Sequence, residues 1–142
     1  MTSEGNLDVV RGFIKAFNKH DIEALIAYCD PQIEFHSTFA AVGGAHYRDH
    51  DGMRRWHREM ESAWGKEMRA ELEALFDLGE TVLVFALLYG KAKESGAEAV
   101  LPIAVVARLR DGLVTYYKAY GHRVDALEDL GVSETTLEAI AP

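Results

Sequence analysis

The sequence contains a single cysteine, Cys29, so no internal disulfide can form, as is typical of a protein in a reducing compartment. Basic residues are few, with 15 Lys and Arg compared with 23 Asp and Glu, and the formal charge is −8. Such a composition does not predict the basic surface that nucleic acids and anionic membranes bind. The longest apolar run, residues 81–89, is far shorter than the ~20 residues that cross a bilayer. Residues 1–6 show no targeting signal, so we expect a cytoplasmic protein with neither a nucleic-acid nor a membrane partner.

What the sequence does contain is the composition of an ordinary globular domain, with 49% apolar and 27% charged residues. The three prolines are isolated, and no linker or repeat interrupts the chain. We expect one domain over residues 1–142, with its body at 6–131 and a short tail at 132–142. A chain of this length buries enough surface to fold without a metal or a disulfide, and no cofactor is expected.

Apolar residues recur at helical spacing in the first half of the chain. They predict one amphipathic helix over residues 7–17 and a second that is capped by Asp21 and ends before Pro31. A third helix is predicted to begin at Asp49 or Asp51 and to run to Trp64, and a short strand at 33–37 precedes it.

From residue 67 onward the apolar period becomes two, which is the spacing of strands. The Asp111-Gly112 pair is a strong signal for a two-residue hairpin, and the other connections are also short. Short connections join antiparallel neighbours, because parallel strands need a long crossover. We therefore predict an α+β fold whose mostly antiparallel sheet curls around the helices, with later strands at 68–76, Thr81–Lys91, Glu98–Arg110 and 113–123 followed by short helical turns.

The strands at 81–89 and 100–107 are apolar on both faces, whereas a sheet with one wet face should alternate. Helices on one side cannot cover both faces of such a sheet. We therefore expect a homodimer through the outer face, with Leu101, Ile103 and Val105 as its contacts.

Small residues at Ala104 and Ala119 are expected on the sheet face that receives large side chains from the helices. An apolar cavity there, with a few polar groups, is the default site for a small apolar molecule. The residues expected to contact such a ligand are Phe13, Phe17, Phe35, Ser37, Trp56, His57, Met60, Tyr89, Ala104 and Ala119.

Four segments, in this order, resemble motifs of the nuclear transport factor 2-like superfamily and its SnoaL-like branch, and the resemblance covers residues 6–131. It implies a curved sheet wrapped as a cone around three helices, with an internal pocket and usually a dimer. The segments are the first helix with its Asn18-Lys19-His20-Asp21 ending, the Tyr47-Arg48 start of the third helix with Trp56, the Asp111-Gly112-Leu113-Val114 hairpin and the closing Tyr120-Gly121-His122-Arg123.

The resemblance also allows known chemistries of the superfamily to be tested by position. The isomerase tyrosine falls on Phe13, its protonated acid on Ala104, and its base on Ser37 or, with one gap, on His36. The epoxide hydrolases of the superfamily need an aspartate where Ala119 stands, and an aspartate and an arginine that residues 81–91 lack. Neither of these two mechanisms is therefore expected.

His36 and Tyr117 are the candidate catalytic residues. A histidine at the end of the first strand can move protons near neutral pH, and Tyr117 shares a face with Ala119 and can donate a hydrogen bond to a carbonyl. The structural alternatives are a surface histidine and a core tyrosine. Two functions stay open: an isomerase, cyclase or dehydratase of a small apolar carbonyl compound, or a non-catalytic ligand-binding or scaffold module.

The densest group of histidines is His46-x-x-x-His50. On a continuous helix, this spacing would let both rings share a metal. Here a turn and a helix start separate the two residues, so no metal site is expected.

Overall fold

The computed structural model of the chain describes residues 3–37, 45–91, 95–137 and 139. Within these residues two helices are followed by two strands, a third helix, four strands, a fourth helix and one 3-10 turn. The elements are α1 (Ser3–Asn18), α2 (Ile22–Ile26), β1 (Cys29–Ser37), β2 (Ala45–Arg48), α3 (Asp49–Trp64), β3 (Arg69–Asp77), β4 (Thr81–Lys91), β5 (Glu98–Arg110), β6 (Leu113–Tyr120), α4 (Arg123–Leu130) and η1 (Glu134–Thr136).

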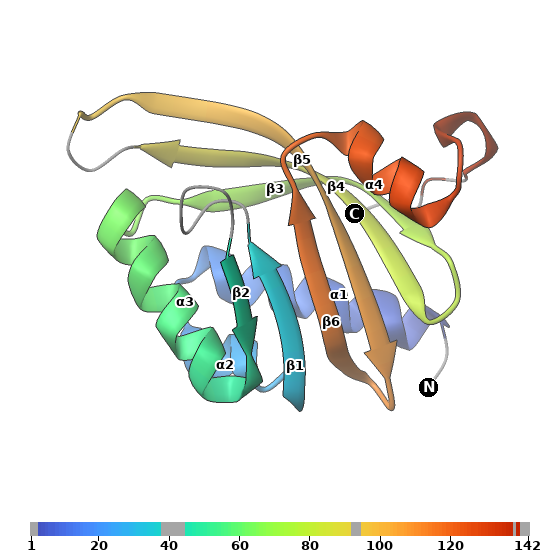
Figure 1. Cartoon of the computed structure of the whole chain (residues 1–142), viewed down its shortest axis with the longest axis horizontal. Helices are drawn as coiled ribbons and strands as arrows, with labels where there is room; N and C mark the ends of the chain where they lie inside the picture. Colours follow the sequence, from blue (N-terminus) through green and yellow to red (C-terminus); the bar gives the residue numbers. More distant parts are fainter. Residues whose placement is uncertain (1–2, 38–44, 92–94, 138, 140–142) are drawn as a thin grey trace.

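The strands form one curved sheet in the order β2-β1-β6-β5-β4-β3 (Figure 1). Every neighbouring pair is antiparallel except β1 and β6, which are parallel. This confirms the predicted α+β cone with a mostly antiparallel sheet. The four-residue strand β2 was not predicted, because it is too short to show a period and its residues precede α3 directly.

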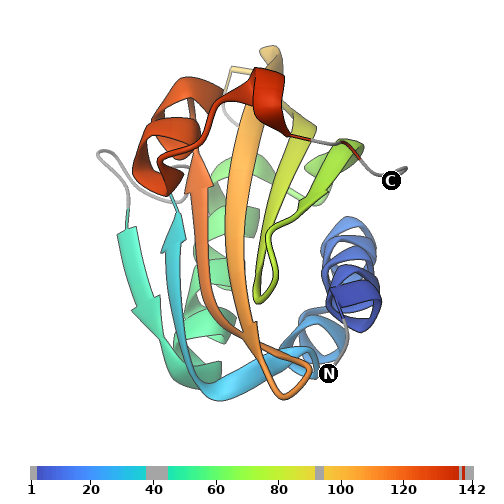
Figure 2. The same cartoon turned by 90° about the vertical axis from the view of Figure 1, so that its right-hand side faces the viewer.

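The helices α1 and α3 pack on the inner face of the sheet and bury the apolar stripes that the sequence predicted (Figure 2). Asp21 caps α2 by accepting a hydrogen bond from the Ala24 N–H at 3.1 Å. The second helix is shorter than expected, because it ends at Ile26 and Cys29 already belongs to β1. Among the described residues, no helix combines the length and the apolar character needed to cross a membrane.

The outer face of the central strands is covered by α4 from the same chain (Figures 1 and 2). Ala104 and Ala126 are both fully buried between this helix and the sheet. Arg123 anchors the start of α4 by donating to the carbonyl oxygens of Ile103 at 3.2 Å and Ala86 at 3.0 Å. The two-sided apolar pattern is therefore largely satisfied within one chain.

The contacts suggested for a homodimer need correction. Ile103 and Val105 face the inner core, where both are buried, and only Leu101 is exposed, at 40%. The homodimer itself stays a prediction, and it can no longer be argued from these two residues.

A bulge in the β5–β6 hairpin explains this error. The hairpin turn at Asp111-Gly112 pairs Leu109 with Val114 in the regular way, but Arg108 then pairs with Tyr116. Thr115 is the extra residue, and its hydroxyl donates to the Arg108 carbonyl oxygen at 3.2 Å. Because side chains alternate along a strand, this single insertion exchanges the two faces of β5 relative to β6.

After the bulge, Ala119 lies opposite Val105, and Ala104 lies opposite Tyr120. The expectation that Ala104 faces the ligand pocket beside Ala119 is therefore wrong. Ala104 lies on the outer face, in the cluster beneath α4.

Candidate functional site

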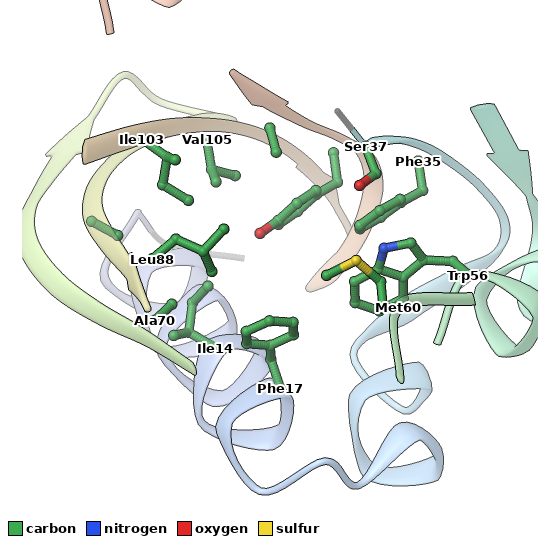
Figure 3. A pocket seen from close by; sticks show the side chains of 13 residues that line it. Ile14, Phe17, Phe35, Ser37, Trp56, Met60, Ala70, Leu88, Ile103 and Val105 are labelled. Atoms are coloured by element: carbon green, nitrogen blue, oxygen red, sulfur yellow. The ribbon is translucent and has the colours of Figure 1, made fainter. Parts of the chain in front are cut away.

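A cavity of about 40 Å³ lies between α1, α3 and the inner face of the sheet. Aliphatic side chains, including Leu88 and Ile103, form one side, and Phe35, Trp56 and Ser37 form the other (Figure 3). The described residues that line the cavity are Ile14, Phe17, Phe35, Ser37, Trp56, Met60, Ala70, Ala86, Leu88, Ile103, Val105, Tyr117 and Ala119.

Three polar groups interrupt this apolar lining. The Tyr117 ring is stacked between Phe13 at 4.8 Å and Phe35 at 4.7 Å, measured between ring centroids. Burial raises the pKa of Tyr117 well above its usual range, so its hydroxyl stays protonated and can donate. The Trp56 ring N–H is buried and has no hydrogen-bond partner in the described part of the chain, and the Ser37 hydroxyl lies on the same side of the cavity (Figure 3).

Most of the residues that the sequence assigned to the pocket do line this cavity. The structure also decides between the two alternatives at the end of the first strand, because Ser37 and not His36 faces inward. The predicted residues found in the lining are Phe17, Phe35, Ser37, Trp56, Met60, Tyr117 and Ala119.

The other assigned residues lie elsewhere. Phe13 is buried behind Tyr117, and Ala104 lies on the outer face. Tyr89 lies near the C-terminal end of β4. The guanidinium carbon of Arg69 is 4.0 Å from the centroid of its ring. His57 faces a second, smaller cavity on the other side of Trp56.

His36 points to the opposite face of β1, away from the cavity. Its ring stacks on that of His46 at 4.2 Å, and the Glu34 carboxylate is 4.0 Å from both rings. The expectation that His36 moves protons in the pocket is therefore not supported by its position. Within the described lining, no side chain carries a carboxylate or an imidazole.

Comparison with known families matches residues 10–117 to the SnoaL-like domain. The chain belongs to the SnoaL-like domain family. This confirms the resemblance found in the sequence, although the last of the four motifs, which begins at Tyr120, lies beyond the matched residues. The comparison with curated proteins gives no match.

Solved structures share the fold of this SnoaL-like domain. An NTF2-like protein of unknown function from Burkholderia pseudomallei is 20% identical, with 87% of this chain and 95% of that chain covered and a TM-score of 0.76. A protein from Catenulispora acidiphila with a ketosteroid isomerase-like fold, in complex with trimethylamine, is 16% identical, with 94% and 97% covered and a TM-score of 0.72. TerC, co-crystallised with polyporic acid, is 20% identical, with 87% and 96% covered and a TM-score of 0.75. At these identities the likeness concerns the fold.

Sequence reasoning missed several residues that line the cavity of the SnoaL-like domain. Four of them alternate along the two central strands, at Ala86 and Leu88 on β4 and at Ile103 and Val105 on β5. The signal was hidden because both faces of these strands are apolar, so alternation alone cannot tell which face is inner. Ile14 and Ala70 were missed as well.

His36 gives a pH prediction for stability. Burial, followed by the charge of His46, lowers the pKa of His36 below its usual value, so the unfolded chain binds its proton more readily. Neutral His36 therefore contributes to the free energy of unfolding above pH ~6.5, and this contribution is lost as the pH falls through the lowered pKa. We expect His36→Gln to lose less stability than the wild type between pH 7 and pH 5, measured by urea unfolding. The charged or polar groups facing His36 are Glu34, His46, Arg48, Tyr116 and Lys118.

The exposed residue His122 provides the control for this comparison, because its side chain makes no ring contact or ion pair with the described residues. An unchanged pH dependence in His36→Gln would contradict the prediction.

Proposed function

We propose that this SnoaL-like domain binds a compact, largely apolar compound that carries a carbonyl or similar acceptor oxygen. The observation that supports this is the buried Trp56 ring N–H, which has no hydrogen-bond partner in the described part of the chain and lines a cavity whose other polar side chains are Tyr117 and Ser37. A buried donor without a partner costs about 1–3 kcal/mol. A ligand oxygen that accepts from the Trp56 N–H recovers this energy, and the Tyr117 hydroxyl can donate to the same oxygen. The apolar body of the ligand supplies the dispersion contacts that an empty cavity lacks.

Binding is favoured over catalysis by the chemistry of the lining. An isomerase, a cyclase or a dehydratase needs a group that accepts a proton near neutral pH. Tyr117 cannot do so, because burial raises the pKa of its hydroxyl. The described lining has no carboxylate or imidazole, so the non-catalytic alternative is the better supported of the two.

The size of the cavity limits the ligand. One water needs roughly 10–15 Å³ of such space, and the cavity offers about 40 Å³. We therefore propose a ligand with a single ring or a short branched chain. Met60, which lines the cavity, is the side chain best able to adjust to its shape, because methionine is unbranched and flexible.

Two probes of nearly the same shape test the proposal: cyclohexanone, and methylenecyclohexane, which lacks the oxygen. We expect both to bind in the range of about 0.1–1 mM, because so few heavy atoms limit the affinity. Of the two probes, only cyclohexanone should show a hydrogen bond to the protein. If its oxygen accepts from Trp56, the ¹H–¹⁵N signal of the Trp56 ring N–H moves downfield; if it accepts from Tyr117, the affinity for cyclohexanone falls when Tyr117 is changed. A Trp64→Phe background leaves Trp56 as the single indole signal.

Tyr117→Phe separates the hydrogen bond from the apolar contacts. We expect this change to lower the affinity for cyclohexanone about five- to tenfold, since a neutral hydrogen bond contributes about 1 kcal/mol. The affinity for methylenecyclohexane should stay nearly unchanged. Absence of any shift with either probe at saturating concentration would contradict ligand binding. Equal effects of Tyr117→Phe on both probes, together with no downfield shift of the Trp56 ring N–H signal by cyclohexanone, would contradict the role of the acceptor oxygen.

A further inference from the structure

A second group of polar side chains converges behind the wall of the cavity. His57 and Glu61 lie one turn apart on the same face of α3. His20 follows α1 in the left-handed backbone region, with φ 55°, which is uncommon for residues other than glycine. Asn18 fixes the end of α1 to β3 by hydrogen bonds to the Ala70 N–H and carbonyl oxygen, at 2.7 and 2.8 Å.

The hydrogen bond of His20 determines which of its ring nitrogens is free. Nε2 lies 2.8 Å from the carbonyl oxygen of Met68, and because a carbonyl only accepts, Nε2 carries the proton. In the neutral ring, Nδ1 then presents a lone pair. His20 Nδ1 lies 3.6 Å from Oε2 of Glu61, which is buried and has no hydrogen-bond partner in the described part of the chain.

His57 completes the group from the other side of the carboxylate. Its Nδ1 lies 3.6 Å from Glu61 Oε1, and its Nε2 is buried with no partner in the described part of the chain. The separations of 3.6 Å are too long for hydrogen bonds. The carboxylate, whose side chain is 25% exposed, thus lies between two imidazoles without a hydrogen bond to either. The buried Oε2 therefore carries a desolvation cost that a cation between these groups would offset.

We propose that His20, His57 and Glu61 bind one divalent transition-metal ion of the Zn²⁺ type. One nitrogen or oxygen of each residue lies within 4.8 Å of the others. Ligands about 2.1 Å from a tetrahedral ion are about 3.4 Å apart. The two observed separations of 3.6 Å end on different oxygens of Glu61, Oε2 for His20 and Oε1 for His57, so one ion would be held by both oxygens or by one of them after a rotation of the carboxylate. Two imidazoles and a carboxylate suit Zn²⁺ and its neighbours, and a fourth position would remain for water.

Two further features fit a metal at this position. The small cavity at these residues, about 10 Å³, is close to the volume of one sphere the size of a water molecule. The bond from His20 Nε2 to the Met68 carbonyl is the contact by which metal-binding histidines are commonly oriented. Phe17, Trp56 and Met60 line this cavity and the larger one, so they separate the proposed ion from the ligand cavity.

The other cluster with ligand atoms within 4.8 Å of one another, Glu34, His36 and His46, is less suited to a metal. Its carboxylate side chain is 46% exposed and its histidines lie at the surface of the sheet. None of its atoms is among the buried polar atoms that lack a partner in the described chain.

The test uses the full chain, stripped with chelator and titrated with Zn²⁺ by calorimetry and with Co²⁺ by visible absorption. We expect one equivalent of Zn²⁺ to bind with a Kd below about 10 µM, and Co²⁺ to show the d–d bands of a four- or five-coordinate site. Glu61→Gln and His57→Gln should each lower the affinity for Zn²⁺ at least about tenfold. His122→Gln and His46→Gln serve as matched controls and should bind as the wild type does.

Circular dichroism of each variant shows whether it is folded, and the Co²⁺ spectrum of the wild type does not depend on any variant. The proposal is overturned if the wild type binds less than one equivalent, if Co²⁺ shows only the spectrum of a six-coordinate ion, or if Glu61→Gln binds Zn²⁺ normally. Loss of binding in His46→Gln would also overturn it, because the ion would then belong to the Glu34 cluster. None of these outcomes depends on the ligand proposed for the larger cavity.

Discussion

Ala119→Leu should abolish cyclohexanone binding, whereas Ala104→Leu should leave it intact. Ala119 lines the cavity, so a larger side chain there occupies the space that the ligand needs. We expect the affinity to fall more than about tenfold, because the three added carbon atoms of the leucine take up space in a cavity of only about 40 Å³, and the ligand loses apolar contacts there. The shift of the Trp56 ring N–H signal measures the loss directly.

Ala104→Leu is the matched control, since it makes the same change on the neighbouring strand but on the opposite face. Ala104 is fully buried beneath α4, where the larger side chain meets Phe85 and Ala126. Overpacking of this kind costs about 1–3 kcal/mol of stability. Ala119→Leu should cost less, because it fills a cavity. If Ala104→Leu removed ligand binding and Ala119→Leu did not, the assignment of the two faces would be wrong.

The contrast between these two alanines shows where sequence reasoning failed. A regular hairpin at Asp111-Gly112 would place Ala104 opposite Ala119, on one face of the sheet. The bulge at Thr115 shifts the pairing by one residue, so Ala104 lies opposite Tyr120. Apolar residues on both faces of β5 gave no signal of this shift, because either face could have been the inner one.

The elements with one buried face were predicted well for the same physical reason. The α1 and α3 helices have a single apolar stripe, and its period indicates both the helix and its inner side. Tyr117 and Ala119, two residues apart on β6, were placed on the cavity side by the same argument. The outer cover by α4 was missed, because a short helix near the end of the chain does not show which surface it will meet.

The cluster of His20, His57 and Glu61 was also beyond the sequence. The spacing of His57 and Glu61 on a predicted helix was visible, but nothing in the sequence placed His20 beside them. Their approach depends on how α1 ends, and Asn18 fixes that end to β3 through hydrogen bonds to Ala70. Contacts between distant segments of this kind are set by tertiary packing, which the periodicity of one segment does not contain.

Phe35→Ala should strongly destabilise the fold. The Phe35 side chain is 2% exposed, and its ring centroid lies 4.6 Å from that of Trp56 and 4.7 Å from that of Tyr117. Removing a buried aromatic ring costs about 3–5 kcal/mol, because its apolar contacts are lost and a cavity remains. Urea unfolding at neutral pH measures this loss as a change in the midpoint at constant slope.

Phe17→Ala is the comparison variant, because it removes the same kind of ring from a position that is less buried and less closely packed. Phe17 also lines the cavity and stacks with Trp56, but at 6.0 Å and with its side chain only partly buried. Its loss should therefore cost clearly less than that of Phe35, since less apolar surface returns to water. Equal losses of unfolding free energy in the two variants would contradict the prediction that the deeper burial of Phe35 and its closer contacts with Tyr117 and Trp56 stabilise the fold more. A loss below about 1 kcal/mol for Phe35→Ala would mean that the inner face can close around the missing ring, and the cavity would then not be the rigid site on which the ligand proposal depends.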